Sequence, residues 1–90
     1  MKHAGSEALA RLDELLAQVR RRPALVERRP GVFYRRGRAF LHFHEDPSGL
    51  FADIRPGDRW DRLPVNDAAD RARVIEAVDR TLAATSGPAD

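Results

Sequence analysis

The chain has 90 residues, of which 42% are hydrophobic and 33% are charged, a length that suits one small globular domain and excludes two. It contains no cysteine, which excludes disulfides, thiolate zinc sites and cysteine nucleophiles. The formal net charge of +2 is uneven, because residues 1–44 carry 10 Lys and Arg against 4 Asp and Glu, whereas residues 45–90 carry 6 against 10.

A first helix is predicted over residues 6–21. Ser6 suits the N-cap position, and Pro23 ends the pattern after a basic C-terminal turn. Apolar residues recur inside this segment at helical spacing, namely Leu9, Leu12, Leu16 and Val19, with Leu15 beside them. We interpret residues 23–30 as a connector that places Leu25 and Val26 under the edge of the core.

From Gly31 the hydrophobic pattern changes to a period of two, which is typical of strands. Residues 32–35, 38–44 and 50–55 are predicted strands, joined by turns centred on Arg36-Gly37 and on Pro47-Ser48. A shorter strand over 60–65 is expected at a sheet edge, because Pro64 has no N–H to donate. A second helix is expected to begin near Asn66 or Asp67 and to end before the chain frays at 86–88. Its apolar stripe is Val74, Ile75, Val78 and Leu82.

These elements predict an α+β fold with two layers. The expected order is α-β-β-β-(β)-α, with an antiparallel meander sheet and two terminal helices packed on one of its faces. The whole chain, residues 1–90, is expected to form a single domain with an ordered core from roughly residue 6 to residue 84.

Counting cross-strand partners outward from the two turns divides the strand residues between two faces. The core face is predicted to hold Val32, Tyr34, Ala39, Leu41, Phe43, Leu50, Ala52 and Ile54. The opposite face, called the outer face below, is predicted to hold Phe33, Arg35, Arg38, Phe40, His42, His44, Phe51, Asp53 and Arg55.

The outer face is the predicted binding surface. Two helices can cover one face of a small sheet, and a solvated face rarely displays three phenylalanines. We therefore expect a homodimer or a protein partner on this face, or else the Trp60 segment folded back over it. An alternative is single-stranded nucleic acid, with bases stacked on the phenylalanines and phosphates beside Arg35, Arg38 and Arg55.

The sequence favours a binding module over an enzyme. No serine lies in a nucleophile elbow, and no glycine-rich phosphate loop precedes a helix. The N-terminal residues lack the apolar run of a signal peptide, and no segment is apolar for long enough to span a bilayer. We therefore expect a cytoplasmic protein that does not contact membranes.

A second alternative for the outer face is a divalent metal. His42 and His44 lie two residues apart on one strand, and Asp53 on the next strand supplies a third ligand, a donor set used by zinc and iron. The competing interpretation is structural, with a hydrogen bond from His42 to Asp53 that raises the pKa of the imidazole. His3 lies in the N-terminal segment and is assigned no role. Without the metal, no cofactor is expected.

The segment GRAFLHFHEDPSGLFADI resembles the strand-turn-strand pattern with His-x-His of a bacterial domain described as luciferase-like. The residues that carry this resemblance are Gly37, His42, His44, Gly49, Leu50 and Asp53. The overall layout is also similar to that of the YjbR-like family, for which DNA binding is suggested. Neither resemblance implies an activity for this chain.

Overall fold

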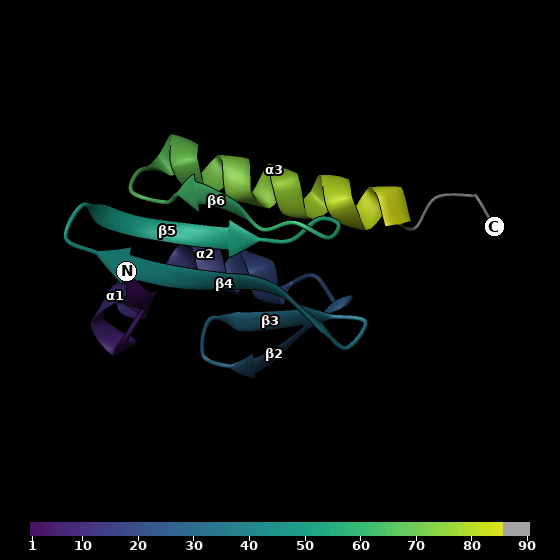
Figure 1. Ribbon diagram of the computed structural model, residues 1–90, viewed down its shortest axis with the longest axis horizontal. Helices are drawn as coiled ribbons and strands as arrows, with labels where there is room; N and C mark the ends of the chain where they lie inside the picture. The colour runs from purple at the N-terminus through teal and green to yellow at the C-terminus, as the bar shows by residue number, and fades with distance from the viewer. Residues whose placement is uncertain (86–90) are drawn as a thin grey trace.

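The computed structural model describes residues 1–85, and its centre is one antiparallel sheet of six strands. The predicted fraying at residues 86–88 lies outside the described residues. The strands follow the order β2-β3-β4-β5-β6, and β1 also pairs with β4 (Figure 1). Their bounds are β1 Lys2–His3, β2 Leu25–Arg29, β3 Val32–Arg35, β4 Arg38–Asp46, β5 Gly49–Ile54 and β6 Asp61–Pro64.

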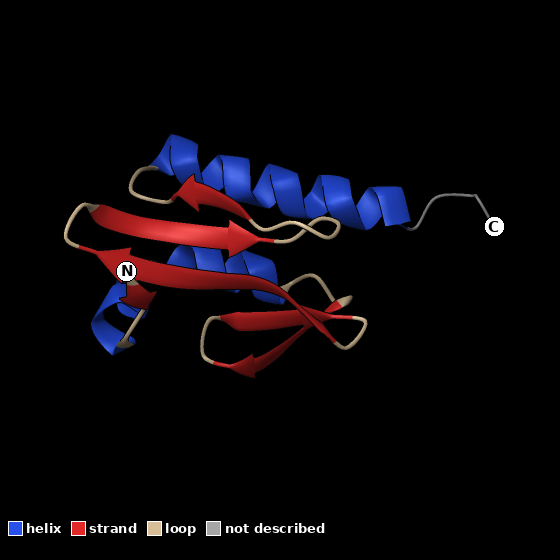
Figure 2. Cartoon of the chain, in the orientation of Figure 1, coloured by secondary structure: helices blue, strands red, loops and turns tan. Residues whose placement is uncertain are grey.

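Three helices accompany the sheet: α1 (Ser6–Arg11), α2 (Asp13–Arg20) and α3 (Ala68–Thr85). Helix α2 lies behind β4 in the view of Figure 2, and α3 runs beside β6 and contacts α2. The predicted α+β fold is therefore confirmed. None of the described helices is both long and apolar enough to cross a membrane.

The first helix differs from its prediction, because Leu12 interrupts it. Leu12 has φ −103° and ψ 16°, outside the helical region, and is the C-cap of α1 and the N-cap of α2. The N-cap of α1 is Gly5 and not Ser6. Helix α3 begins as expected, since the Asp67 carboxylate accepts a 2.8 Å hydrogen bond from the backbone N–H of Asp70.

The core lies between the sheet and the helices. The helical stripes predicted from the sequence supply one side of it, and alternate residues of the strands supply the other. Each fully buried large apolar side chain stabilises the fold by about 1.5–3 kcal/mol. Buried members include Leu12, Leu15, Leu16, Val19, Val74 and Val78 from helices, and Phe33, Leu41, Phe43, Leu50, Ala52 and Ile54 from strands.

The prediction of a connector over residues 23–30 is wrong in part, because residues 25–29 form strand β2. Leu25 is buried as predicted, but Val26 is 57% exposed. The Glu27 carboxylate accepts two hydrogen bonds from Arg20 and one from the backbone N–H of Gly31. These contacts hold β2 in place. Its charged residues obscure the alternation of apolar and polar side chains by which a strand is predicted from sequence. Gly31 has φ +76°, and a Cβ there would lie 2.8 Å from Leu9, so this turn requires glycine.

The register of β4 and β5 matches the prediction at every pair from Leu41–Ile54 to Glu45–Leu50. The register of β3 and β4 matches next to the turn, at Arg35–Arg38 and Tyr34–Ala39, but beyond it a bulge places Phe33 opposite Leu41 instead of Phe40. Directly paired residues share a face, so Phe33 moves to the core, where it is 1% exposed. Val32 and Tyr34, predicted for the core, are only half-buried.

The N-terminal segment also folds onto the sheet. Strand β1 pairs with β4 at Lys2–Glu45 and His3–His44, beside the part of β4 that β3 leaves unpaired. The Glu45 carboxylate accepts a 2.7 Å hydrogen bond from the backbone N–H of Gly5. A short β1 therefore brings His3 onto the same sheet as His42 and His44.

Candidate metal centre

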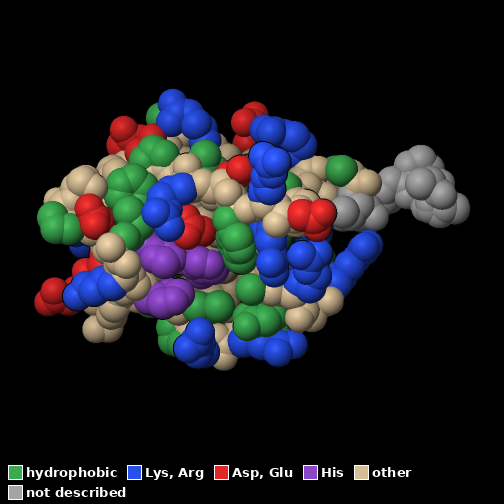
Figure 3. All heavy atoms as spheres, in the orientation of Figure 1, with side chains coloured by type: hydrophobic (Ala, Val, Ile, Leu, Met, Phe, Trp, Pro, Cys, Tyr) green, Lys and Arg blue, Asp and Glu red, His purple; other side chains and the backbone are tan. Residues whose placement is uncertain are grey.

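Three histidines meet on the outer face. His42 and His44 share this face because side chains alternate along β4, and His3 joins them because its cross-strand partner is His44. Their side chains gather at the surface over β4 in Figure 3. His3 is exposed, whereas His42 and His44 are half-buried.

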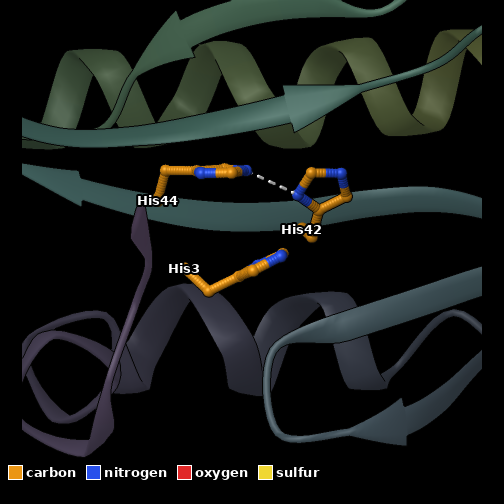
Figure 4. Close-up of side chains that lie close together, drawn as sticks. All are labelled: His3, His42 and His44. Atoms are coloured by element: carbon orange, nitrogen blue, oxygen red, sulfur yellow. Dashed lines mark hydrogen bonds between the residues drawn. The ribbon is translucent and has the colours of Figure 1, made fainter. Parts of the chain in front are cut away.

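The imidazole rings form a compact group, called the histidine cluster below (Figure 4). Ring centres lie 4.8 Å apart for His3 and His44, 4.9 Å for His42 and His44, and 5.4 Å for His3 and His42. One ligand nitrogen from each ring lies within 4.8 Å of the others. The nitrogens His44 Nε2 and His42 Nδ1 are 2.9 Å apart and share a hydrogen bond. Three potential metal ligands therefore converge from two strands.

Asp53 lies beside the cluster on β5, as the cross-strand partner of His42, and is 6% exposed. Its carboxylate accepts two hydrogen bonds from Arg62, of 2.7 and 2.8 Å, and its Oδ2 lies 3.2 Å from His44 Nε2. The hydrogen bonds from Arg62 lower the pKa of the Asp53 carboxyl, outweighing its burial. Asp53 is therefore a carboxylate at neutral pH and is in contact with His44.

The predicted hydrogen bond between His42 and Asp53 is not the one that forms. The two residues are cross-strand partners as expected, but the Asp53 carboxylate bonds Arg62 and contacts His44. The pKa of the His42 imidazole is lowered and not raised, chiefly by burial and then by the charge of His44. Burial likewise lowers the pKa of His44, although Asp53 opposes that shift. Both rings are therefore neutral at pH 7, which is the form that binds metal.

One nitrogen of the cluster is poorly satisfied. Nδ1 of His44 is buried and has no hydrogen-bond partner among the described atoms. An unsatisfied buried polar group costs about 1–3 kcal/mol. The cluster therefore contains a polar atom that the protein's own groups leave without compensation.

Trp60 borders the histidine cluster. Its ring centre lies 4.6 Å from that of His42, and the Arg55 guanidinium carbon lies 4.7 Å from the indole centre. The side chain remains 40% exposed. The Trp60 segment thus folds back onto the outer face, one of the coverings expected from the sequence.

The remaining residues of the predicted binding face are distributed differently. Phe33 lies in the core, Phe40 is 2% exposed, and Phe51 is half-buried. The open array of three phenylalanines, on which the expected dimer and the expected nucleic-acid platform depended, is therefore not present at the surface. Both functions stay predictions. The three arginines of the face, Arg35, Arg38 and Arg55, line a separate hollow described below.

Sequence reasoning missed His3. Its partner His44 is far away in the sequence, and a two-residue strand has no hydrophobic pattern of its own. The available signal was the residue type, because the chain contains three histidines and the other two are His42 and His44.

No family model, curated protein or solved structure matches the chain. The resemblances to the luciferase-like domain and to the YjbR-like family therefore stay predictions.

Proposed function

We propose that this domain binds one divalent transition-metal ion, zinc in the first place, through His3, His42 and His44. The observation that carries the proposal is the convergence of three imidazoles, with ligand nitrogens within 4.8 Å of one another. Three histidines with a fourth coordination position left open form an established zinc geometry.

The spacing requires only a small adjustment. With zinc–nitrogen distances of about 2.0–2.1 Å, ligand nitrogens in a tetrahedral site lie about 3.4 Å apart. His42 and His44 already approach to 2.9 Å. His3 is the exposed member, on a two-residue strand, and its side chain can rotate to complete the set.

Asp53 supports the site by its charge. Its Oδ2 lies 3.2 Å from His44 Nε2, the same nitrogen that faces His42 Nδ1, and Arg62 holds the carboxylate by two hydrogen bonds. A negative charge beside the ligand nitrogens favours a bound cation over an empty site. We assign Asp53 to this supporting position and His3 to the ligand set in its place.

The test is metal titration of the full chain, purified without a histidine tag and with a native N-terminus. We expect one zinc per chain by elemental analysis, and an increase in thermal stability when zinc is added to chelator-treated protein. Ligand binding at 100 times Kd stabilises the native state by about 2.7 kcal/mol. Absence of stoichiometric metal together with no thermal shift would refute the proposal.

Three variants test the ligand set, and two of them, His3→Ala and Asp53→Asn, distinguish the alternatives. His3→Ala is expected to abolish stoichiometric zinc, as is His42→Asn, whereas Asp53→Asn is expected to weaken zinc binding by about 10–100-fold without abolishing it. If His3→Ala keeps its zinc and Asp53→Asn loses it, the ligand set is His42, His44 and Asp53, as the sequence predicts. Ser48→Ala, in the turn between β4 and β5, serves as the control.

We also propose that the protein acts in the cytoplasm and self-associates. What supports self-association is the open coordination position, which a side chain of a second copy could fill, beside the half-exposed Trp60. Light scattering on metal-free and zinc-loaded protein tests it. A doubled mass with zinc supports the homodimer, and a monomer in both states contradicts it.

A further inference from the structure

A second constellation lies away from the histidine cluster, where the β3–β4 turn meets the end of β5. A hollow of about 110 Å³ opens there. Basic side chains gather at this end of the molecule in Figure 3, near the β3–β4 turn of Figure 1. The lining residues are Arg35, Arg36, Arg38, Ala39, Phe40, Arg55 and Gly57.

We propose that this arginine hollow binds a phosphate group in its dianionic form. Four of the lining side chains are arginines, and no carboxylate is among the described residues that line it. Clefts for drug-sized molecules measure about 300–1,000 Å³, so this volume suits a single small group. Arginine presents its N–H donors in a planar fork that matches phosphate oxygens.

The concentration of charge favours a dianion over a carboxylate. A carboxylate carries one negative charge and is satisfied by one arginine in bidentate geometry, whereas a phosphate monoester carries up to two charges and three terminal oxygens. Burial, together with the charges of Arg36 and Arg38, lowers the pKa of the Arg35 guanidinium. The like charges around the hollow therefore repel one another, and a bound dianion would relieve this repulsion.

Contacts within the fold hold the arginines of the hollow in position. Arg55 donates hydrogen bonds of 3.0 and 2.6 Å to the carbonyl oxygen of Ala39. The Arg35 guanidinium carbon lies 5.1 Å from the centre of the buried Phe40 ring. Among the described residues, Arg38 forms an ion pair with Asp58 at 4.0 Å, and the Asp58 side chain is 99% exposed. A side chain so exposed competes weakly with a ligand.

The turn that carries Arg36 supports a role for this side chain. Arg36 has φ +54° and is followed by Gly37 at φ +79°. A two-residue hairpin turn of this kind favours Asn-Gly, because its first residue must also adopt positive φ. Arg36 is the single non-glycine residue with positive φ among the described residues. The turn thus places an arginine beside the hollow where asparagine would suit the backbone better.

The test is calorimetric titration of inorganic phosphate into the full chain, in chelator so that no metal takes part. We expect saturable binding of one phosphate per chain and weaker binding of acetate. Trp60, the single tryptophan of the chain, reports the same event by fluorescence, since Arg55 lies over its ring. No saturable phosphate binding, or acetate binding as tightly as phosphate, overturns the proposal.

Matched variants distinguish phosphate binding in the hollow from nonspecific attraction to the positive charge of the protein. Arg36→Asn removes one charge and keeps a residue suited to positive φ, and it is expected to weaken phosphate binding by about tenfold or more. Arg80→Gln removes the same charge from α3, where Arg80 pairs with Glu76, and is expected to leave phosphate binding within about twofold. Equal losses in the two variants would overturn the proposal.

Two oligonucleotides identify the source of the phosphate. A short single-stranded oligothymidylate with a 5′-phosphate is compared with the same strand without it. Preference for the phosphorylated strand indicates a terminal phosphate on nucleic acid, and equal weak binding of both indicates a small phosphate compound. If the unphosphorylated strand binds more tightly than inorganic phosphate and equals the phosphorylated one, the site recognises phosphodiester chains and the proposal fails.

Discussion

The histidine cluster and the arginine hollow are neighbouring regions rich in basic residues, and their side chains differ in charge at pH 7. Trp60 touches both, since its ring lies 4.6 Å from the ring of His42 and 4.7 Å from the guanidinium carbon of Arg55. In the cluster, burial lowers the pKa of His42 and His44, so these bases are neutral at pH 7. In the hollow the side chains are arginines, which remain charged.

The position of the neighbouring acid explains the difference in stability that we expect. Asp53 is buried against the cluster and is held by Arg62, whereas Asp58 beside the hollow is almost fully exposed. Buried charge pairs are costly to break, and exposed pairs contribute little. The cluster therefore combines neutral imidazoles with a buried carboxylate and suits a cation, while the described lining of the hollow holds four arginines and no carboxylate and suits an anion.

The largest effect on stability is expected from Asp53→Asn. This change keeps the shape of the side chain but removes the charge that accepts two hydrogen bonds from Arg62. We expect a loss of about 2 kcal/mol in the free energy of unfolding, measured by urea denaturation of metal-free protein at pH 7.5. Asp58→Asn is the control and should leave the denaturation midpoint unchanged. Equal effects of the two substitutions would contradict the contrast between the regions.

A smaller effect is expected from pH. The native state holds His42 and His44 at lowered pKa values, against about 6.5 when unfolded. Just below pH 6.5 the unfolded chain therefore binds more protons than the native one, and stability should fall as the pH is lowered. The charged and titratable groups that act on these two rings are His3, Asp53, Arg62 and, for His44, the N-terminal amino group, and Asp53 stays ionised throughout this range.

Urea midpoints of metal-free protein between pH 8 and pH 5 measure this dependence. The double variant His42→Asn, His44→Asn should flatten it. A stability that rises as the pH falls would instead show that Asp53 stabilises a protonated imidazole, as the sequence predicts.

The smallest effect has the opposite sign and concerns the arginine hollow. Arg36→Asn places a residue that tolerates positive φ in the β3–β4 turn and removes one repelling charge. We expect a gain of about 0.5–1 kcal/mol in stability without phosphate. The gain is measured as an upward shift of the thermal midpoint at low salt. A loss of stability would mean that the Arg36 side chain supports the fold, and the two regions would then be alike.

Local patterns in the sequence determined the β4–β5 hairpin and its faces. The Asp46-Pro47-Ser48-Gly49 turn fixes the pairing from Glu45–Leu50 to Leu41–Ile54, because hairpin register is set by the turn and by alternation along the strands. His42, His44 and Asp53 were therefore placed correctly on one side of the sheet. The helical stripes, with their period of about 3.6 residues, were likewise readable.

Only the tertiary structure decided the features that make the two candidate sites. The bulge between β3 and β4 moves Phe33 into the core, and no turn residue announces it. The pairing of His3 with His44 joins distant segments through a two-residue strand, and the arginine hollow combines a turn with the end of β5. Such contacts depend on where packing leaves an unpaired strand edge or an open corner. Spacing in the sequence does not predict that outcome, because the residues involved become neighbours only after the sheet has assembled.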